Sequence, residues 1–202
     1  MVTDISRRSA LSTIGLGLAA MALLPGQVWA LSTQEGASLV EKLVTDINKV
    51  INSGKSEKSM YKDFERIFAK YADVSFVALA SLGVDARRAS KAQRGAYVKA
   101  YQGYISRKYG KRFREFIGGR LELQGTKAVK KHVEVKTMAH LRGEAPFDVT
   151  FLVSDRSGKP KFFNMYIEGV NMVLTEKTEI GAMLDRRGGD IDKLIADLKK
   201  AS

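Results

Sequence analysis

Two histidines, His132 and His140, are the only imidazole side chains in this chain of 202 residues. Both fall on one face of a predicted strand, where eight extended residues separate them by about 26 Å. One metal ion cannot bind both, so we interpret them as exposed sheet residues. The chain has no cysteine, which excludes thiol catalysis and thiolate metal sites.

Other signatures of catalysis are absent from the sequence. It contains no phosphate-binding loop, no dinucleotide fingerprint and no nucleophile elbow. A serine and a histidine, or two carboxylates, can still converge in a fold without being neighbours in the sequence. No spacing in the sequence argues for either arrangement, and we predict a protein that is not an enzyme and that has no cofactor and no metal site.

One long segment, residues 87–114, is strongly basic and contains no acidic residue. Its interleaved aromatic residues are typical of helices that bind nucleic acids. The pattern also fits a solvated helix face above a buried aromatic stripe, which we favour, or a surface that docks on an anionic membrane or protein. The ten basic residues are Arg87, Arg88, Lys91, Arg94, Lys99, Arg107, Lys108, Lys111, Arg112 and Arg114.

The first 30 residues have the layout of a secretory signal peptide. Arg7 and Arg8 precede an uncharged, mostly apolar run that ends in Val28-Trp29-Ala30, with small residues where a signal peptidase cuts. The run is too short and too rich in glycine to cross a membrane comfortably. We predict cleavage after Ala30 and export to the periplasm, by the general secretory or the twin-arginine route.

Export changes which partners the basic charge indicates. Residues 31–202 form a single domain of ordinary size by length, and most of the formal net charge of +12 lies in them. Nucleic acid is not an expected partner outside the inner membrane. Lipid head groups, lipopolysaccharide and acidic protein surfaces are the anionic partners that remain.

Apolar spacing predicts helices in the first half of the domain, over residues 38–51, 61–71 and 74–82 and from Ser90 to about residue 117. The segment 74–82 is apolar nearly all round, so we expect it to be buried. Three glycines in the last helix predict a bend or a close contact with another element.

From residue 118 the apolar period changes to two, which predicts strands at 121–124, 132–141, 147–153, 162–170 and 172–175. A hairpin turn is expected at 155–158, and short helices at 179–184 and 191–198. Helices segregated from strands indicate an α+β fold, with helices packed on one face of a mostly antiparallel, twisted sheet.

The stretch 162–198 resembles the C-terminal signature of the MlaC family, also called the toluene-tolerance or organic-solvent-resistance auxiliary family. The likeness is most specific at Ile167-Glu168-Gly169-Val170-Asn171 and continues through Gly188-Gly189 to Leu194-Ile195-Ala196-Asp197-Leu198. Asn164 stands where the family usually has aspartate, and Asn171 where it has serine. These departures indicate a divergent member.

The resemblance implies a periplasmic phospholipid carrier whose fold, partly similar to that of NTF2, encloses an apolar cavity. Such carriers exchange phospholipid with an inner-membrane transporter that contains an MCE-domain protein and with an outer-membrane lipoprotein complex, touch membrane surfaces transiently and maintain outer-membrane lipid asymmetry. The bound phospholipid is then a ligand and not a cofactor.

We expect the cavity to be lined by the short apolar helix, the aromatic stripe and one face of the sheet. The predicted lipid-binding residues are Phe76, Leu79, Leu82, Tyr101, Tyr104, Ile105, Phe147, Val149, Phe151, Phe163, Met165 and Ile167. Two alternatives remain open: a cavity-containing α+β enzyme of the isomerase type, and a basic periplasmic adaptor with a solid core.

Overall fold

The computed structural model describes residues 31–112 and 119–201. Within these residues the sheet has the strand order β1-β2-β3-β4-β5, and every neighbouring pair is antiparallel. The predicted antiparallel sheet is therefore confirmed. Its strands are β1 (Arg120–Val129), β2 (His132–His140), β3 (Phe147–Ser154), β4 (Lys161–Ile167) and β5 (Val170–Asn171).

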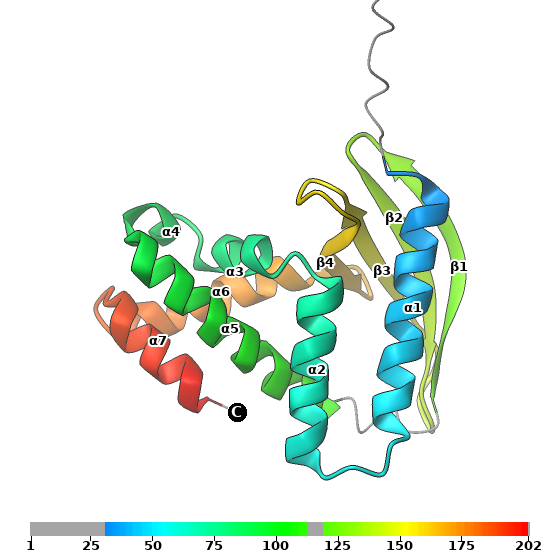
Figure 1. Ribbon diagram of the computed structural model, residues 1–202, viewed down its shortest axis with the longest axis horizontal. Coiled ribbons are helices and arrows are strands. Elements are labelled where there is room, and N and C mark those ends of the chain that lie inside the picture. The colour runs from blue at the N-terminus through cyan, green and yellow to red at the C-terminus, as the bar shows by residue number, and fades with distance from the viewer. Residues whose placement is uncertain (1–30, 113–118, 202) are drawn as a thin grey trace, which may run out of the picture.

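The helices cover one face of this sheet and continue beyond the edge formed by β4 and β5 (Figure 1). This arrangement confirms the predicted α+β class. The helices are α1 (Thr33–Ile51), α2 (Glu57–Tyr71), α3 (Val74–Leu82), α4 (Asp85–Arg88), α5 (Lys91–Arg112), α6 (Met172–Asp185) and α7 (Ile191–Lys200).

Helix α1 begins five residues earlier than its apolar spacing predicts. Ser32 and Glu35 form a capping box, in which each side chain accepts a hydrogen bond from the other's backbone N–H. Near this end, Gly36 lies so close to β2 that an added Cβ would be 2.8 Å from a methyl carbon of Val133. The glycine therefore lets α1 lie directly on the sheet.

The turn between β4 and β5 consists of Glu168 and Gly169, which have φ angles of 50° and 78°. Positive φ at both central residues is the geometry of a type I′ hairpin turn, and glycine at the second position adopts it without strain. The flanking residues Ile167 and Val170 pair across the hairpin. The Ile-Glu-Gly-Val motif is therefore a tight turn that ends the sheet.

The strand predicted over residues 172–175 is wrong. Asn171 is both the last residue of β5 and the N-cap of α6, where its side chain accepts a hydrogen bond from the backbone N–H of Leu174. The helix predicted to begin at residue 179 therefore begins at Met172. A short apolar run fits either a strand or a buried helical turn, and the asparagine cap decides between them here.

Helix α3 has the predicted bounds but is not buried all round, because Phe76 is exposed on its outer side. Helix α5 begins after Ser90, which forms a second capping box with Gln93. Gly110 makes the predicted close contact, since an added Cβ would lie 2.6 Å from the ring of Tyr61 in α2. The predicted end of this helix near residue 117 lies outside the described residues.

The predicted signal peptide, residues 1–30, also lies outside the described part of the chain. Among the residues that the structure does describe, no helix is long and apolar enough to cross a membrane.

The buried apolar side chains form two clusters. The sheet core lies between the sheet and helices α1 and α2, and the helical core joins α3, α5, α6 and α7. The sheet core contains Val40, Leu43, Ile47, Ile51, Met60, Phe64, Tyr71, Ala72, Val133, Val135, Ala139, Val149, Phe151, Val153 and Phe162. The helical core contains Val77, Ala78, Leu82, Ala89, Tyr97, Ala100, Tyr101, Tyr104, Ile105, Ile180, Leu184, Ile191, Leu194, Ile195 and Leu198.

Candidate functional site

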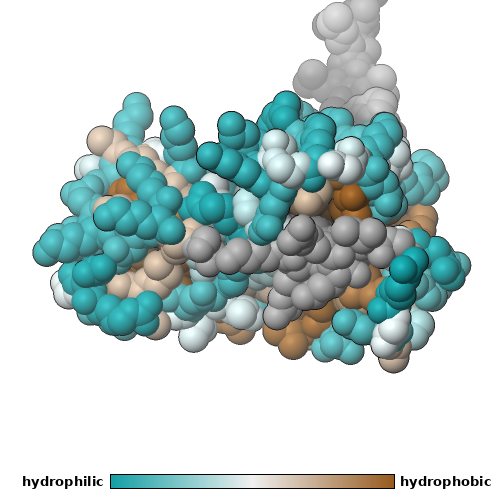
Figure 2. Space-filling view, turned by 90° about the horizontal axis from the view of Figure 1, so that it is seen from below, coloured by the Kyte–Doolittle hydropathy of each residue, from teal (hydrophilic) through white to brown (hydrophobic). Residues whose placement is uncertain are grey.

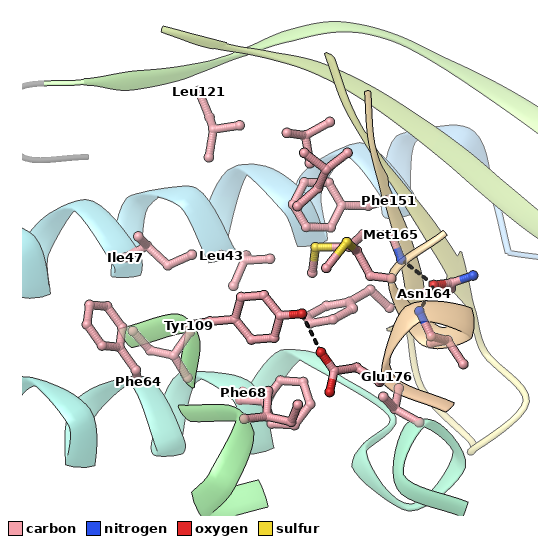
Figure 3. Close-up of a pocket in the computed structure, with 18 of the residues that line it drawn as sticks. Leu43, Ile47, Phe64, Phe68, Tyr109, Leu121, Phe151, Asn164, Met165 and Glu176 are labelled. Carbon is pink, nitrogen blue, oxygen red and sulfur yellow. Dashed lines mark hydrogen bonds between the residues drawn. The ribbon is translucent and has the colours of Figure 1, made fainter. Parts of the chain in front are cut away.

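An apolar cavity of about 360 Å³ lies where the two cores meet (Figure 3). This volume is within the range of about 300–1,000 Å³ that is usual for ligand pockets. It is lined by Leu43, Ile47, Phe64, Ile67, Phe68, Val77, Tyr101, Ile105, Ser106, Tyr109, Leu121, Leu141, Glu144, Phe147, Val149, Phe151, Phe162, Asn164, Met165, Ile167, Glu168, Met172, Val173 and Glu176.

The cavity exists because the elements around it pack on one another in a ring. Helix α1 packs directly on β1, β2 and β3, and α2 packs against α1 on one side and α5 on the other. Helix α6 closes the ring by packing against β4. Space is therefore left between α2, α5 and the exposed part of the sheet face.

Alternation along two neighbouring strands supplies the sheet wall of the cavity. Phe147, Val149 and Phe151 are two residues apart on β3, and two of them pair directly with residues of β4, Val149 with Ile167 and Phe151 with Met165. Side chains two residues apart on a strand share a face. The wall is thus a continuous apolar surface across both strands.

The helices α1 and α2 supply the opposite wall. Leu43 and Ile47 are four residues apart on α1, and Phe64 and Phe68 are four residues apart on α2, so each pair lies on one side of its helix. Figure 3 shows these side chains directed at the same space as Phe151 and Met165. Apolar groups therefore face each other across the cavity.

One polar cluster interrupts this apolar lining at the helices α5 and α6. Glu176 is buried, and its Oε1 atom accepts hydrogen bonds from Lys108 Nζ at 2.7 Å and from the hydroxyl of Tyr109. Lys108 also bonds to Glu179, whose other oxygen accepts from Tyr104 at 2.6 Å. The lysine thus compensates a carboxylate that the fold removes from water.

The pKa shifts in this cluster keep its lysine charged and its tyrosines protonated. Burial lowers the pKa of Lys108, but the two glutamates that accept its hydrogen bonds raise it above its ordinary value overall. Burial raises the pKa of Tyr109, and the charge of Glu176 raises it further. Both hydroxyl and ammonium groups therefore act as donors at neutral pH.

Two oxygen atoms of the cavity wall have no hydrogen-bond partner among the described residues. They are Oε2 of Glu176 and the hydroxyl of Tyr101. Tyr101 is completely buried, and burial raises the pKa of its hydroxyl well above the ordinary value. Each buried polar atom that stays unpaired costs about 1–3 kcal/mol.

Seven of the twelve predicted lipid-binding residues lie on the cavity wall. They are Tyr101, Ile105, Phe147, Val149, Phe151, Met165 and Ile167. Their contact with a lipid stays a prediction.

The other five predicted residues lie elsewhere. Leu82 and Tyr104 are buried in the helical core, and Leu79 is only partly buried on α3, where Val77 faces the cavity instead. Phe76 and Phe163 contact each other edge to face, with ring centroids 5.8 Å apart.

The displacement of Phe163 has a local cause in the pairing of β3 and β4. Val153 pairs with Phe162 and Leu152 with Asn164, so the register shifts at Phe163 and this residue has no partner. An extra residue of this kind interrupts the simple alternation of faces. Phe162 lines the cavity as a result, and an inference from period-two spacing selects the wrong phenylalanine.

Sequence reasoning missed the α1 and α2 walls and the polar cluster. The spacing of residues 38–51 and 61–71 showed which face of each helix is apolar. It carried no signal to separate side chains that touch the sheet from those that face an open space. The sequence did offer one signal for Glu176: it is an acidic residue one turn after the mostly apolar beginning of a helix.

The basic segment is not a uniform free surface. Arg107 donates hydrogen bonds to the backbone carbonyls of Leu198 and Ala201, at 2.6 and 2.9 Å, and so fixes the end of α7. Lys108 belongs to the polar cluster of the cavity. These two residues have structural partners, whereas Arg87, Lys91 and Lys99 are exposed. The side chains of residues 111–114 lie outside the described part.

The two histidines lie at opposite ends of β2, as their spacing predicts. Both are half-buried and not fully exposed: His140 Nε2 is 3.2 Å from a carboxylate oxygen of Glu122, and His132 packs edge-on against Phe163. Among the described residues, no group of three histidine, aspartate or glutamate side chains is placed to hold a metal ion.

Comparison with known proteins connects this geometry to a family. A family model described as MlaC protein matches residues 39–200 of the chain. A phospholipid-binding protein from Ralstonia solanacearum, solved in complex with a phospholipid, has the same fold with a TM-score of 0.71. The two sequences are 17% identical, and the match covers 82% of this chain and 96% of that one.

Proposed function

This chain belongs to the MlaC family, and from that premise we propose that it is a phospholipid carrier that holds acyl chains in the cavity between its sheet and helices. The observation that carries the proposal is the apolar cavity itself, whose walls come from five helices and three strands. The bound phospholipid of the Ralstonia solanacearum protein, which has the same fold, supports it.

The energetics of lipid transfer favour a carrier with such an interior. A diacyl lipid exposes roughly 30 methylenes, and hiding them from water is worth on the order of 20 kcal/mol at about 0.8 kcal/mol each. Free diffusion through water is therefore negligible. Because cavity and bilayer are both apolar, transfer between them is nearly balanced and needs no catalytic group.

The position of the exposed lining residues indicates where the cavity reaches the surface. Glu144 and Glu168 are exposed members of the cavity lining, in the loop before β3 and the turn after β4. These two segments are adjacent, because the Glu168 N–H donates to the carbonyl of Asp148 at 2.9 Å. We propose that the cavity opens at this end and that the acyl chains extend from it along the strands.

The surface on the side seen in Figure 2 is consistent with an entrance for an apolar ligand. Apolar side chains gather there between hydrophilic ones. A carrier that touches a membrane transiently needs an apolar border through which a lipid can pass. Basic side chains around this border would favour contact with an anionic membrane, by about 1 kcal/mol each.

The wider role is part of the same proposal. Residues 1–30 act as a cleavable signal, and residues 31–202 work in the periplasm as one lipid-binding domain. There the carrier exchanges phospholipid between an inner-membrane MCE-domain transporter and an outer-membrane lipoprotein complex, which maintains outer-membrane asymmetry. The open cavity argues against the alternative of a basic adaptor with a solid core.

Lipid content of the purified protein tests the proposal. Organic extracts of the wild-type protein, analysed by mass spectrometry, should contain phospholipid. The Val149→Asp variant should lose it, because a carboxylate in the cavity wall is unfavourable beside acyl chains. Ile67→Asp introduces the same carboxylate at a half-buried wall position and should also lose lipid. It replaces Val149→Asp in the test if Val149→Asp fails to fold.

Thr150→Asp is the matched control, because Thr150 is next in the strand and points to the opposite face. It should keep its lipid, and circular dichroism should show folded protein for each variant compared. Folded Val149→Asp and Ile67→Asp proteins with unchanged lipid would contradict this site. A wild-type protein that neither contains phospholipid nor takes it up from vesicles would contradict the carrier function.

A further inference from the structure

A second pocket, which is polar and basic, lies between α1 and α2. The two helices pack side by side (Figure 1), and the pocket between them has a volume of about 330 Å³. Ile67 lines this pocket and also the apolar cavity, so the two spaces are neighbours. The lining of the second space, which we call the basic pocket, consists of Asp46, Lys49, Val50, Ser53, Lys55, Asp63, Arg66, Ile67 and Lys70.

The charges in the basic pocket do not cancel. Each of its two carboxylates is close to two basic side chains. The pairs are Asp46 with Lys70 at 2.8 Å and with Lys49 at 3.8 Å, and Asp63 with Lys55 at 2.7 Å and with Arg66. Among the described lining residues, four positive charges therefore meet two negative ones. A surplus of two positive charges remains at neutral pH.

The basic side chains keep hydrogen-bond donors that the carboxylates do not use. A lysine has three N–H donors and an arginine has five, whereas Lys55 and Lys70 each donate one to a carboxylate. The side chains of Lys49 and Arg66 are 73% and 76% exposed. Exposed ion pairs of this kind are weak and rearrange readily. An anion that enters the pocket can therefore accept from several of these donors at once.

The basic pocket is continuous with a wider basic surface on α2. Lys58, Lys62, Arg66 and Lys70 follow one another at intervals of four residues, and all four are exposed. Residues four apart lie on the same side of a helix. They form a ridge about 18 Å long, at 1.5 Å per residue, whose last two members line the pocket. Such a surface raises the local concentration of anions beside the pocket.

A phosphate group matches this arrangement better than other anionic groups do. A terminal phosphate carries about 1.5 to 2 negative charges at pH 7 and has three strong acceptor oxygens, which fit a surplus of two positive charges with several free donors. A carboxylate carries only one charge and two oxygens. Arginine also binds phosphate with two parallel hydrogen bonds, and Arg66 is available for this contact.

We propose that the basic pocket is a binding site for a terminal phosphate group, carried by an anionic lipid or free in solution. This inference goes beyond the proposed carrier function, which needs only the apolar cavity. A lipid phosphate bound here at a membrane surface would hold α1 and α2 against the bilayer. These helices form one wall of the cavity, so the site would bring that wall close to the lipids that the carrier exchanges.

Titration of the full-length mature protein with inorganic phosphate tests the site. Amide signals of residues 46–70, followed by NMR spectroscopy of the ¹⁵N-labelled protein at neutral pH and low salt, should shift saturably. Flotation with phosphatidylcholine vesicles, prepared with and without phosphatidic acid, measures binding to a lipid phosphate. We expect the protein to float only with the phosphatidic acid vesicles, and inorganic phosphate to displace it from them.

A double variant assigns the binding to the pocket. Lys49→Gln with Arg66→Gln removes the surplus charge but leaves each carboxylate one basic partner, so the protein should fold normally by circular dichroism. Its affinity for inorganic phosphate should fall about tenfold or more. Lys91→Gln with Lys99→Gln is the matched control, because it removes two exposed charges from α5, outside the pocket. The control should keep nearly the wild-type affinity.

The outcomes decide both the site and the source of its phosphate. The site is refuted if phosphate shifts no amide signals of residues 46–70, or if the two double variants lose affinity equally. Saturable binding of free phosphate without flotation would support the site with soluble phosphate as its ligand, and displaceable flotation would support a lipid phosphate. The phospholipid content of the same preparations tests the carrier function separately, so either proposal can fail alone.

Discussion

The helical core and the sheet core differ in how much of each borders the cavity. In the helical core Ile180, Leu194 and Leu198 are completely buried. On the sheet side Val135 and Val153 are as completely buried, but Met165 and Ile167, which pack against the sheet core, line the cavity and remain partly exposed. Both regions are built from ordinary apolar residues, so composition does not account for the difference.

The arrangement of the elements does account for it. Helices α3, α5, α6 and α7 pack on one another, and helix surfaces interdigitate closely in such contacts. Helix α1 covers β1, β2 and β3, whereas α3 and α6 contact mainly β4 and β5 and α2 packs mainly on α1 and α5. A binding cavity thus results from a missing contact, while the neighbouring solid core keeps the surrounding helices in place.

Truncation of a large side chain should have its greatest effect in the solid core. Leu194→Ala should lower the free energy of unfolding by about 2–5 kcal/mol, because the surrounding helices cannot collapse into the space. Met165→Ala borders space that already exists and should cost about 1 kcal/mol, mainly from lost burial. Urea unfolding of the lipid-free proteins gives both values.

Equal costs for these two substitutions would contradict the comparison, since they would show that both regions are packed alike. The lipid content provides the complementary measurement. Folded Leu194→Ala protein should still bind phospholipid, because Leu194 does not line the cavity.

The sequence predicted the elements better than the space between them. The helix at 74–82 and the hairpin turn at 155–158 agree with the structure, because local spacing and turn residues determine them. Period-two spacing also identified the cavity face of β3. The register shift at Phe163 and the N-cap at Asn171 were not visible in periodicity.

The helix walls of the cavity could not be predicted from periodicity for a physical reason. An apolar face on α2 shows that Phe64 and Phe68 point inward, but a filled interior and a hollow one require the same pattern. Whether α2 rests on the sheet or on its neighbouring helices is decided by contacts distant in sequence. The family resemblance predicted a cavity, and the structure identifies the side chains that line it.

Two tyrosines of α5, Tyr97 inside the helical core and Tyr101 on the cavity wall, extend the comparison to single hydroxyl groups. Tyr97→Phe removes a hydroxyl that bonds to Ser81 inside the solid core, and this should cost about 1 kcal/mol of unfolding free energy. Tyr101→Phe removes a hydroxyl without a partner among the described residues. In lipid-free protein it should be neutral or slightly stabilising, which thermal or urea unfolding measures. A larger loss for Tyr101→Phe would show that its hydroxyl is already satisfied.

Acid should act on the two regions through different carboxylates, and its effect on stability should be smaller than that of the substitutions above. Asp46 joins α1 to α2 by accepting hydrogen bonds from Lys70 at 2.8 Å and Tyr71 at 2.7 Å. These partners hold its pKa below the ordinary value of 3.8. Arg187 similarly lowers the pKa of Asp197, in the helical region.

A lowered pKa in the folded state means that the unfolded chain binds the proton more tightly. The stability from Asp46 is therefore complete above pH 3.8 and is lost as the pH falls through the lower, folded-state value. In Asp46→Asn the free energy of unfolding, measured from pH 5 downward, should fall less steeply with acid than in the wild type. The substitution should also weaken the contact between α1 and α2 beside the cavity. Asp197→Asn should likewise reduce the acid dependence of the free energy of unfolding, but it should leave lipid retention at neutral pH unchanged. If Asp197→Asn released lipid and Asp46→Asn did not, the wall formed by α1 and α2 would not be the part of the fold that keeps the cavity in shape.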